Sequence, residues 1–158
     1  MTIYRNAKGF TLIEIVAVLI VLGILSAVVI SRGISTSDVN LKAQAEVLKS
    51  HIRYAQFRAM NMKSDTALCN ASFGIGISGN SYFLFRDCNT GNKMALPGAS
   101  SDTVSLPNVT LSPSPTVITF DDWGRPYPNA NGTGTSSSIS LSLSGEPINI
   151  TKNTGYVQ

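Results

Sequence analysis

The strongest pattern in the sequence is an uninterrupted run of apolar residues near its start. From Phe10 to Ile30 there are 21 residues, and Glu14 is the only charged residue among them. As an α-helix this run would be about 30 Å long, roughly the hydrocarbon thickness of a bilayer. Core helices of soluble proteins are seldom apolar on every face, so the run predicts a transmembrane helix over residues 10–30. A carboxylate near the membrane core costs roughly 2.5–3.5 kcal/mol, so Glu14 implies a partner.

Residues 31–63 carry a second helical pattern, in which only one face is apolar. The apolar positions alternate in spacings of four and three: Leu41, Ala45, Leu48, Ile52, Ala55, Ala59 and Met62. Three small alanines and only about three repeats favour docking onto a sheet over a coiled coil. Between the two helical patterns, residues 31–38 are rich in glycine and hydroxyl residues, which soften a helix. We expect an amphipathic continuation of the first helix.

The remaining residues, 64–158, predict β-structure. Alternation over 73–77, the turn Gly79-Asn80 and the return over 82–85 make the strongest hairpin. Shorter strands are expected at 103–106, 109–111, 117–120, 139–143 and 148–150, with long loops at 88–102 and 121–138. The predicted fold class is therefore α+β, with a long N-terminal helix packed on an antiparallel β-sheet domain.

Charge and cysteine content limit the kinds of partner and the compartment. Arg5 and Lys8 immediately precede the apolar run, which predicts a cytoplasmic N-terminus and an exported C-terminal domain. Without the first nine residues the formal charge falls from +3 to +1, which is no nucleic-acid signature. Cys69 and Cys88 both lie in the exported part, where an oxidising compartment favours a disulfide over two buried thiols.

The residues around the start of the apolar run carry a family resemblance. Gly9-Phe10-Thr11-Leu12-Ile13-Glu14, after a short basic leader, closely resembles the class III signal of type IV pilins and type II secretion pseudopilins. The resemblance implies that a prepilin peptidase removes leader residues 1–9 by cutting between Gly9 and Phe10. It also implies methylation of Phe10 and a contact between Glu14 and the N-terminal amine of a neighbouring subunit. Without the motif, Glu14 would equally suit a snorkelling residue or a transporter relay.

Later segments resemble one branch of this family. Residues 52–60 are similar to the helix end of H-type pseudopilins, and residues 120–126 and 154–156 to the sequences that close their domain; MSHA-type minor pilins share this ending. The resemblance implies a structural minor pilin or pseudopilin with no catalytic role and no cofactor. Its implied partners are other pilins in a filament, the prepilin peptidase, the assembly platform and inner-membrane lipid. The implied localisation is the inner membrane, which the chain crosses once, with the C-terminal domain in the periplasm. After assembly the protein would be part of a periplasmic or surface filament.

Other candidate chemistry is weaker. Asp121 and Asp122 are weak calcium candidates, because the acidic spacing of an EF-hand is missing and Asp-rich turns are common. His51 lies among charged helix positions and no nucleophile is paired with it, so it is interpreted as a solvated helix residue. Core filling is the expected role of Trp123 and Tyr127, with a contact patch as the alternative.

DNA binding at the tip of a competence pilus is the alternative function, because some H-like relatives capture DNA there. Such binding needs clustered cations on the exported domain. The candidate cations are scattered, and acidic residues stand beside two of them: Arg86, Lys93, Arg125 and Lys152. Nucleic acid is therefore not an expected partner.

Overall fold

The computed structural model describes residues 9–31, 36–63, 69–112 and 114–158. It divides into two compact units, Met1–Thr36 and Ser37–Gln158, which we call unit 1 and unit 2. The leader up to residue 8 and the predicted helical continuation through residues 32–35 lie outside the described residues.

Unit 1 contains helix α1, Leu12–Ser31. Its large apolar side chains are exposed within the chain, from 41% at Val16 to 82% at Leu12. Within the described ranges, no helix is long and apolar enough to cross a membrane. The transmembrane segment 10–30 stays a prediction.

Helix α2, Thr36–Asn61, supplies one wall of the core of unit 2. The predicted apolar stripe is confirmed at five positions that are at most 2% exposed: Ala45, Leu48, Ile52, Ala55 and Ala59. Leu41 is partly buried against the same core. Met62 is 39% exposed, so its place in the stripe was wrong; it lies beyond the last residue of the helix.

His51 was also interpreted wrongly, because it is buried at 6% exposure. One ring nitrogen, Nδ1, lies 2.8 Å from the hydroxyl of Tyr82, and Nε2 lies 3.1 Å from the carbonyl oxygen of Pro97. Since a carbonyl only accepts, Nε2 donates to Pro97, and Nδ1 shares a hydrogen bond with the Tyr82 hydroxyl. His51 is three residues from Leu48 and next to Ile52, so it borders the buried stripe and reaches polar partners across the core.

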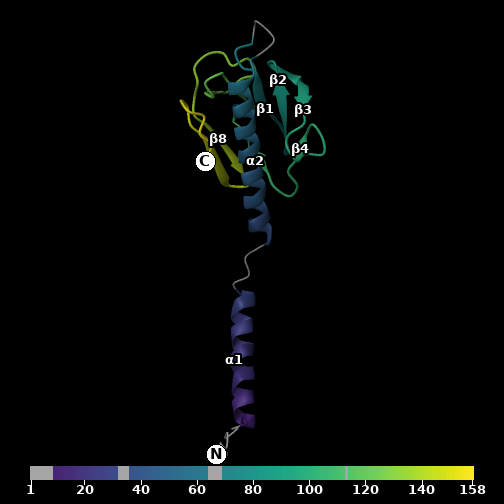
Figure 1. The fold of residues 1–158 in the computed structure, drawn as a ribbon, viewed down its shortest axis with the longest axis vertical. Helices are drawn as coiled ribbons and strands as arrows, with labels where there is room; N and C mark the ends of the chain where they lie inside the picture. Colours follow the sequence, from purple (N-terminus) through teal and green to yellow (C-terminus); the bar gives the residue numbers. More distant parts are fainter. Residues whose placement is uncertain (1–8, 32–35, 64–68, 113) are drawn as a thin grey trace, which may run out of the picture. The chain divides into compact units, whose positions relative to one another are not determined.

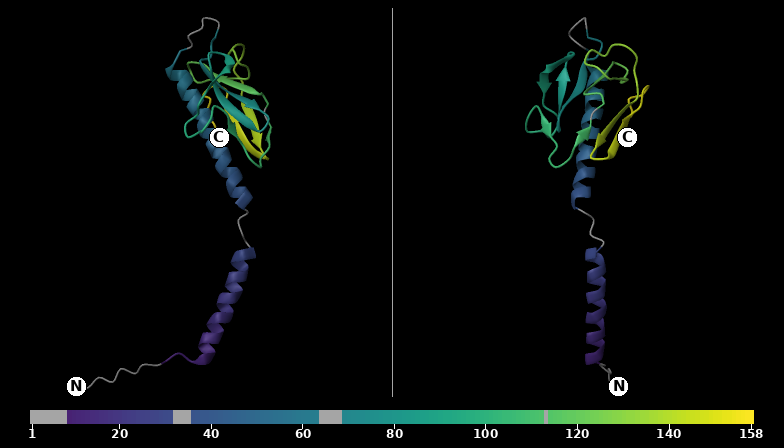
Figure 2. Two further views of the ribbon diagram at one scale, coloured as in Figure 1. Left: turned by 90° about the vertical axis from the view of Figure 1, so that its right-hand side faces the viewer. Right: turned by 180° about the vertical axis from the view of Figure 1, so that it is seen from behind.

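The larger sheet has six antiparallel strands in the order β3-β2-β1-β6-β7, with β4 also paired to β2. The predicted hairpin is confirmed as β1, Phe73–Ser78, and β2, Ser81–Arg86. The other strands are β3 at Asn89–Met94, β4 at Val104–Ser105, β6 at Val117–Phe120 and β7 at Pro126–Tyr127. In Figures 1 and 2, α2 runs along one face of this sheet.

Two glycines in β1 leave room for aromatic rings from β2 on the face of the strand where the glycines lie. Gly76 pairs with Phe83 and Gly74 with Phe85. A Cβ added at Gly76 would lie 2.6 Å or less from two atoms of the Phe83 ring, and one at Gly74 would lie 2.6 Å from the ring of Phe85. The alternation over 73–77 therefore puts large apolar side chains on one face of β1, and glycines on the other face leave room for the rings of Phe83 and Phe85.

A second sheet contains three strands in the order β5-β8-β9. These strands are β5 at Leu111–Ser112, β8 at Ile139–Leu143 and β9 at Glu146–Ile150. Its inner residues share one hydrophobic core with α2 and the larger sheet, and Val157 near the C-terminus bridges back to Ile150. The structure thus confirms the α+β class with helices and antiparallel sheet.

Strands β3 and β7 fall inside segments that were predicted to be long loops. The first five residues of β3 are exposed and read Asn-Thr-Gly-Asn-Lys, so the segment lacks the apolar alternation that identifies a strand. β7 begins with Pro126, which is tolerated because β7 is an edge strand. Both are edge strands specified by their neighbours rather than by their own pattern.

Candidate functional site

The residues before α1 are open to contact. Gly9 and Phe10 are exposed, with Phe10 at 79%. A Cβ added at Gly9 would meet nothing within 4 Å. Packing in the described residues therefore does not require glycine at this position.

Thr11 caps the first turn of α1. The backbone N–H of Glu14 lies 3.3 Å from the Thr11 hydroxyl oxygen and 3.1 Å from its carbonyl oxygen. Thr-x-x-Glu is the capping-box sequence, in which a hydroxyl and a carboxylate satisfy helix N-terminal donors. A carboxylate also interacts favourably with the positive end of the helix dipole. Sequence reasoning missed this local role, although the spacing of Thr11 and Glu14 was sufficient to indicate it.

The rest of α1 offers an apolar surface with few polar groups. Glu14 is exposed and is the only charged residue in the helix. The hydroxyl of Ser26 donates to the carbonyl oxygen of Leu22 at 2.8 Å, so it needs no outside partner. Such a helix can pack against apolar groups along its length while one carboxylate near its start receives a cation.

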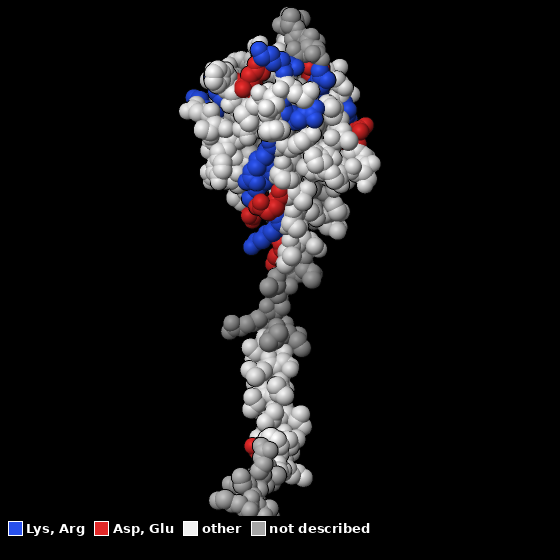
Figure 3. Space-filling model, in the orientation of Figure 1, with Lys and Arg blue, Asp and Glu red and all other residues white. Residues whose placement is uncertain are grey.

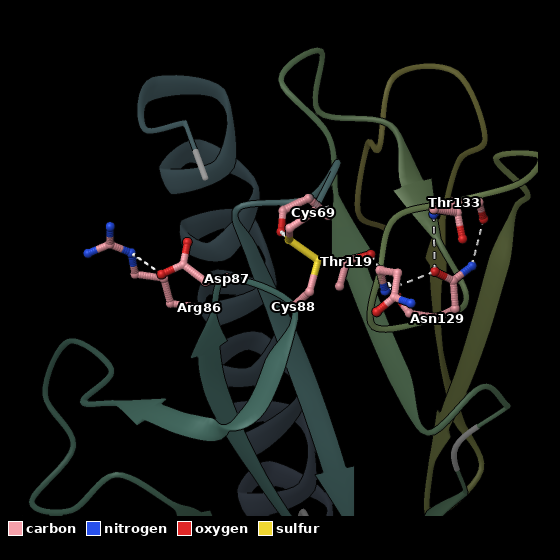
Figure 4. The surroundings of a disulfide bond; sticks show 9 residues. Cys69, Arg86, Asp87, Cys88, Thr119, Asn129 and Thr133 are labelled. Carbon is pink, nitrogen blue, oxygen red and sulfur yellow. Dashed lines mark hydrogen bonds and ion pairs between the residues drawn. A yellow bond between two sulfur atoms is a disulfide. The ribbon is translucent and has the colours of Figure 1, made fainter. Parts of the chain in front are cut away.

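In unit 2, Cys69 and Cys88 form a disulfide with a Cα–Cα distance of 5.8 Å (Figure 4). The bond joins the segment before β1 to the turn after β2. The proposed exported location and the disulfide are chemically compatible, because disulfides persist in oxidising compartments.

Asp121 organises a tight turn that follows β6. One carboxylate oxygen, Oδ1, accepts from the backbone N–H groups of Trp123 and Arg125 at 3.0 and 2.8 Å. The other, Oδ2, accepts from Arg125 Nε at 2.7 Å and from the Tyr127 hydroxyl at 3.2 Å. Hydrogen bonding and charge attraction by Asp121 raise the pKa of Arg125. Asp121 is 7% exposed, whereas Asp122 is exposed.

The two acidic residues therefore differ: Asp122 is exposed, whereas the carboxylate of Asp121 holds a turn together. Its two oxygens already accept four hydrogen bonds from the turn and from Tyr127. Across the described ranges there is no group of three or more His, Cys, Asp or Glu side chains that could hold a metal ion.

The two aromatic residues near this turn differ. Tyr127 is 7% exposed and fills the core as expected, and burial is the main cause that raises the pKa of its hydroxyl. Trp123 is 78% exposed, so its expected core role was wrong. The turn held by Asp121 directs Trp123 outward, beside a cleft of about 340 Å³ that the sequence did not reveal.

The charged residues that bear on DNA binding are interspersed with acids. Arg86 Nε lies 3.0 Å from a carboxylate oxygen of Asp87. The ammonium of Lys93 lies 4.4 Å from the centre of the Phe83 ring. On the face shown in Figure 3, basic and acidic side chains alternate over unit 2 and do not gather into one basic surface.

Comparison with known proteins identifies the N-terminal segment alone. Residues 4–30 match the family described as the Prokaryotic N-terminal methylation motif. No curated protein and no solved structure matches the chain. The match covers Gly9, Phe10, Glu14 and most of α1, so the chain carries the N-terminal segment of a type IV pilin-like precursor. In general terms the motif indicates a membrane-anchored structural protein that a prepilin peptidase processes and that assembles with other pilins.

Proposed function

We propose that this protein is a minor pilin or pseudopilin, a structural subunit of a type IV pilus or a type II secretion pseudopilus. Prepilin peptidase cuts it between Gly9 and Phe10, and the new N-terminal Phe10 is methylated. The observation that carries the proposal is the match of residues 4–30 to the methylation motif, which includes most of α1 and its exposed apolar surface.

Before assembly, residues 10–30 anchor the subunit in the inner membrane. Arg5 and Lys8 keep the N-terminus in the cytoplasm, and residues 64–158 form the periplasmic β-rich domain. In the filament, α1 exchanges lipid for the helices of other subunits. Both surroundings are apolar, so close packing between helices offsets the loss of lipid contacts. The assembly platform drives this transfer.

Glu14 sets the register between subunits by accepting the N-terminal ammonium group of a neighbour. Two features support this role: Glu14 is the only charge in α1, and cleavage creates one cation at Phe10. In an apolar filament core each charge requires the other. The capping contact of Thr11 holds the first turn of the helix in place, so Glu14 projects from an ordered helix.

Processing provides the most direct test. Full-length chain co-expressed with a prepilin peptidase should lose Met1–Gly9, and mass spectrometry should find Phe10 at the N-terminus with one extra methyl group. Gly9→Val should block the cut, because a β-branched side chain crowds the backbone that the protease must grip.

Gly23→Val is the matched control, since a Cβ at Gly23 also meets nothing within 4 Å. This variant should be cleaved like the wild type. An uncut wild-type chain, or a cut after Ala27, would make the protein an ordinary anchored or secreted β-protein and refute the proposal.

Assembly is tested separately with Glu14→Ala and the isosteric Glu14→Gln. Removing one member of a buried ion pair costs about 3–5 kcal/mol, so incorporation into filaments should fall by more than about tenfold for both variants. Membrane insertion should stay intact. Ser26→Ala, which removes only a hydroxyl satisfied inside α1, should assemble normally. If Glu14→Gln entered filaments as well as the wild type, the negative charge of Glu14 would not be needed for assembly.

DNA capture at a pilus tip is the competing function, and the charge distribution favours the structural one. Two of the four candidate cations, Arg86 and Arg125, lie within 3.0 Å of neighbouring acids. A salt-sensitive mobility shift of labelled DNA by the full chain would support the competing function.

A further inference from the structure

The cleft beside the Asp121 turn lies wholly within unit 2 and is lined by Asn70 and by two neighbouring segments, 121–127 and 132–134, that are far from Asn70 in the sequence. Trp123 and Arg125 line one wall, Gly132 and Thr133 line a second, and Asn70 also belongs to the lining. At about 340 Å³ it falls in the size range of small-molecule sites.

The first wall is held rigidly. Asp121 accepts the backbone N–H groups of Trp123 and Arg125, and the N–H of Asp121 itself donates to the carbonyl of Arg125 at 3.2 Å. Gln56 on α2 donates to the carbonyl of Gly124 at 2.9 Å. An exposed indole on a fixed backbone loses little freedom when it binds a ligand, which favours affinity.

Asn129 holds the second wall in the same way (Figure 4). Its side-chain oxygen accepts from the N–H groups of Asn131 and Thr133 at 3.1 and 3.2 Å, and its amide nitrogen donates to the carbonyl of Thr133 at 2.8 Å. Thr119 in β6 donates to the carbonyl of Asn129 at 2.8 Å. The loop is therefore ordered by its own side chain and fastened to the sheet.

The disulfide and a close glycine contact fix the segment that contains Asn70. Asn70 directly follows Cys69, and its N–H donates to the carbonyl of Asn131 at 3.3 Å. Gly132 lies so near Ala71 that an added Cβ would come within 2.5 Å of the Ala71 Cβ. All three sides of the cleft are thus pre-organised.

The lining combines an aromatic face with paired donors and acceptors. Asn70, Thr133 and Asp122 are exposed, and the side chain of Arg125 is 45% exposed while its Nε is held by Asp121. Amide, hydroxyl, carboxylate and guanidinium groups together can donate to and accept from neighbouring hydroxyls. The indole of Trp123 presents a large apolar surface next to them.

Charge limits the ligand further. The cleft is lined by two acids, Asp121 and Asp122, and by Arg125, so its formal charge is −1. Arg125 is already paired with Asp121 at 2.7 Å. A phosphate or an acidic sugar would meet the exposed Asp122 with no free positive charge to compensate. A neutral polyhydroxylated ring meets no such repulsion.

We propose that this cleft binds a neutral pyranose unit of a glycan, with the C–H face of the ring against Trp123 and its hydroxyls bonded to the polar lining. Asn70, Asp122, Arg125 and Thr133 supply those polar groups. The site lies entirely in unit 2, so it does not depend on whether the chain assembles through α1.

The test uses full-length chain in lipid nanodiscs prepared without glycoside detergents, whose head groups would compete. Trp123 is the only tryptophan, so its emission reports on this cleft alone. Triacetylchitotriose, cellotriose and maltotriose are titrated up to about 10 mM, because shallow sites bind weakly. A saturable change in emission is expected with at least one of them. Oligo(dT), a heparin-derived octasaccharide and a proline-rich decapeptide are titrated in parallel and should give none.

Variants then assign the binding to the cleft by calorimetry. Trp123→Ala should weaken the sugar at least about tenfold, or about 1.4 kcal/mol, and Trp123→Tyr should recover much of the loss because it restores an aromatic face. Asn70→Ala should also weaken binding. Tyr156→Ala removes an aromatic side chain that is 59% exposed and outside the cleft, so affinity should not change.

Folding does not obscure the result, since removal of a side chain that is 78% exposed should leave the thermal midpoint unchanged. The proposal is overturned if none of the three neutral sugars binds, or if Trp123→Ala binds them as well as the wild type. Saturable binding of oligo(dT) or the decapeptide with no sugar binding would also overturn it.

Discussion

Substitution of Asp121 should lower the free energy of unfolding of unit 2 in two separable steps. Asp121 is 7% exposed and its two carboxylate oxygens have different partners. Asp121→Asn keeps an acceptor for the backbone N–H groups of Trp123 and Arg125 but removes the charge and the second acceptor. Asp121→Ala removes both sets of hydrogen bonds.

The expected sizes follow from the partners. Oδ2 accepts from Arg125 at 2.7 Å, and a hydrogen bond to a charged group contributes about 1.5–3 kcal/mol. The Arg125 side chain is 45% exposed and can turn to water, so the lower value, about 1.5 kcal/mol, applies to Asp121→Asn. Asp121→Ala also loses the two hydrogen bonds that Oδ1 accepts from backbone N–H groups, worth about 1 kcal/mol each, so its cost should be about 3.5 kcal/mol.

Urea unfolding of the full chain measures both steps. Circular dichroism follows the secondary structure of the whole chain, and Trp123 emission follows the turn in unit 2. Asp122→Asn is the matched control, because Asp122 is an exposed acid next to Asp121, and it should stay within about 0.5 kcal/mol of wild type. All variants should keep the wild-type dependence on urea concentration.

Two results would refute this reasoning. Equal costs for Asp121→Asn and Asp121→Ala would mean that the backbone contacts of Oδ1 contribute nothing. Costs below about 0.5 kcal/mol for both would place Asp121 among ordinary surface residues, contrary to its burial and its four hydrogen bonds.

Three further predictions concern the core and the disulfide. Burial raises the pKa of Tyr82 from 10 to about 12, so its contribution to stability should be complete below pH 10 and fall by roughly 1.4 kcal/mol per pH unit between pH 10 and 12; Tyr82→Phe should flatten this slope in unfolding measured against pH. Replacing Cys69 and Cys88 by serine opens a loop with a separation of 19 residues and should cost roughly 3 kcal/mol, and an unchanged unfolding midpoint would contradict this. Ile52→Ala removes a side chain that is 0% exposed and should cost about 2–5 kcal/mol in urea, whereas Val47→Ala on the exposed face should cost under about 0.5 kcal/mol.

Elements with a local cause were predictable from the sequence. The stripe of α2 follows from a spacing of three and four residues, and five of its positions are buried as expected. The first hairpin follows from alternation on both sides of Gly79-Asn80, where Gly79 has a φ of 57°. The N-terminal motif is a contiguous stretch, so the sequence alone also identified it.

Elements without a local cause were decided by tertiary structure. His51 occupies a polar position by sequence, yet the Tyr82 hydroxyl and the Pro97 carbonyl, 31 and 46 residues away, satisfy its ring in the core. Edge strand β3 has no apolar alternation of its own and depends on pairing with β2. A tryptophan side chain is expected in the core, but the hydrogen bonds of Asp121 turn the backbone so that the Trp123 side chain faces outward.

The sequence by itself therefore determined the N-terminal motif, the two helical patterns and the main hairpin, because each depends on residues that are near neighbours in the chain. Only the tertiary structure decided the cleft, since Asn70, Trp123 and Thr133 come from three separate segments. The N–H of Asn70, which donates to the carbonyl of Asn131, and the close approach of Gly132 to Ala71 bring the first of these segments against the third. Contacts of that kind close long loops, and no periodicity in the sequence encodes which loops will meet.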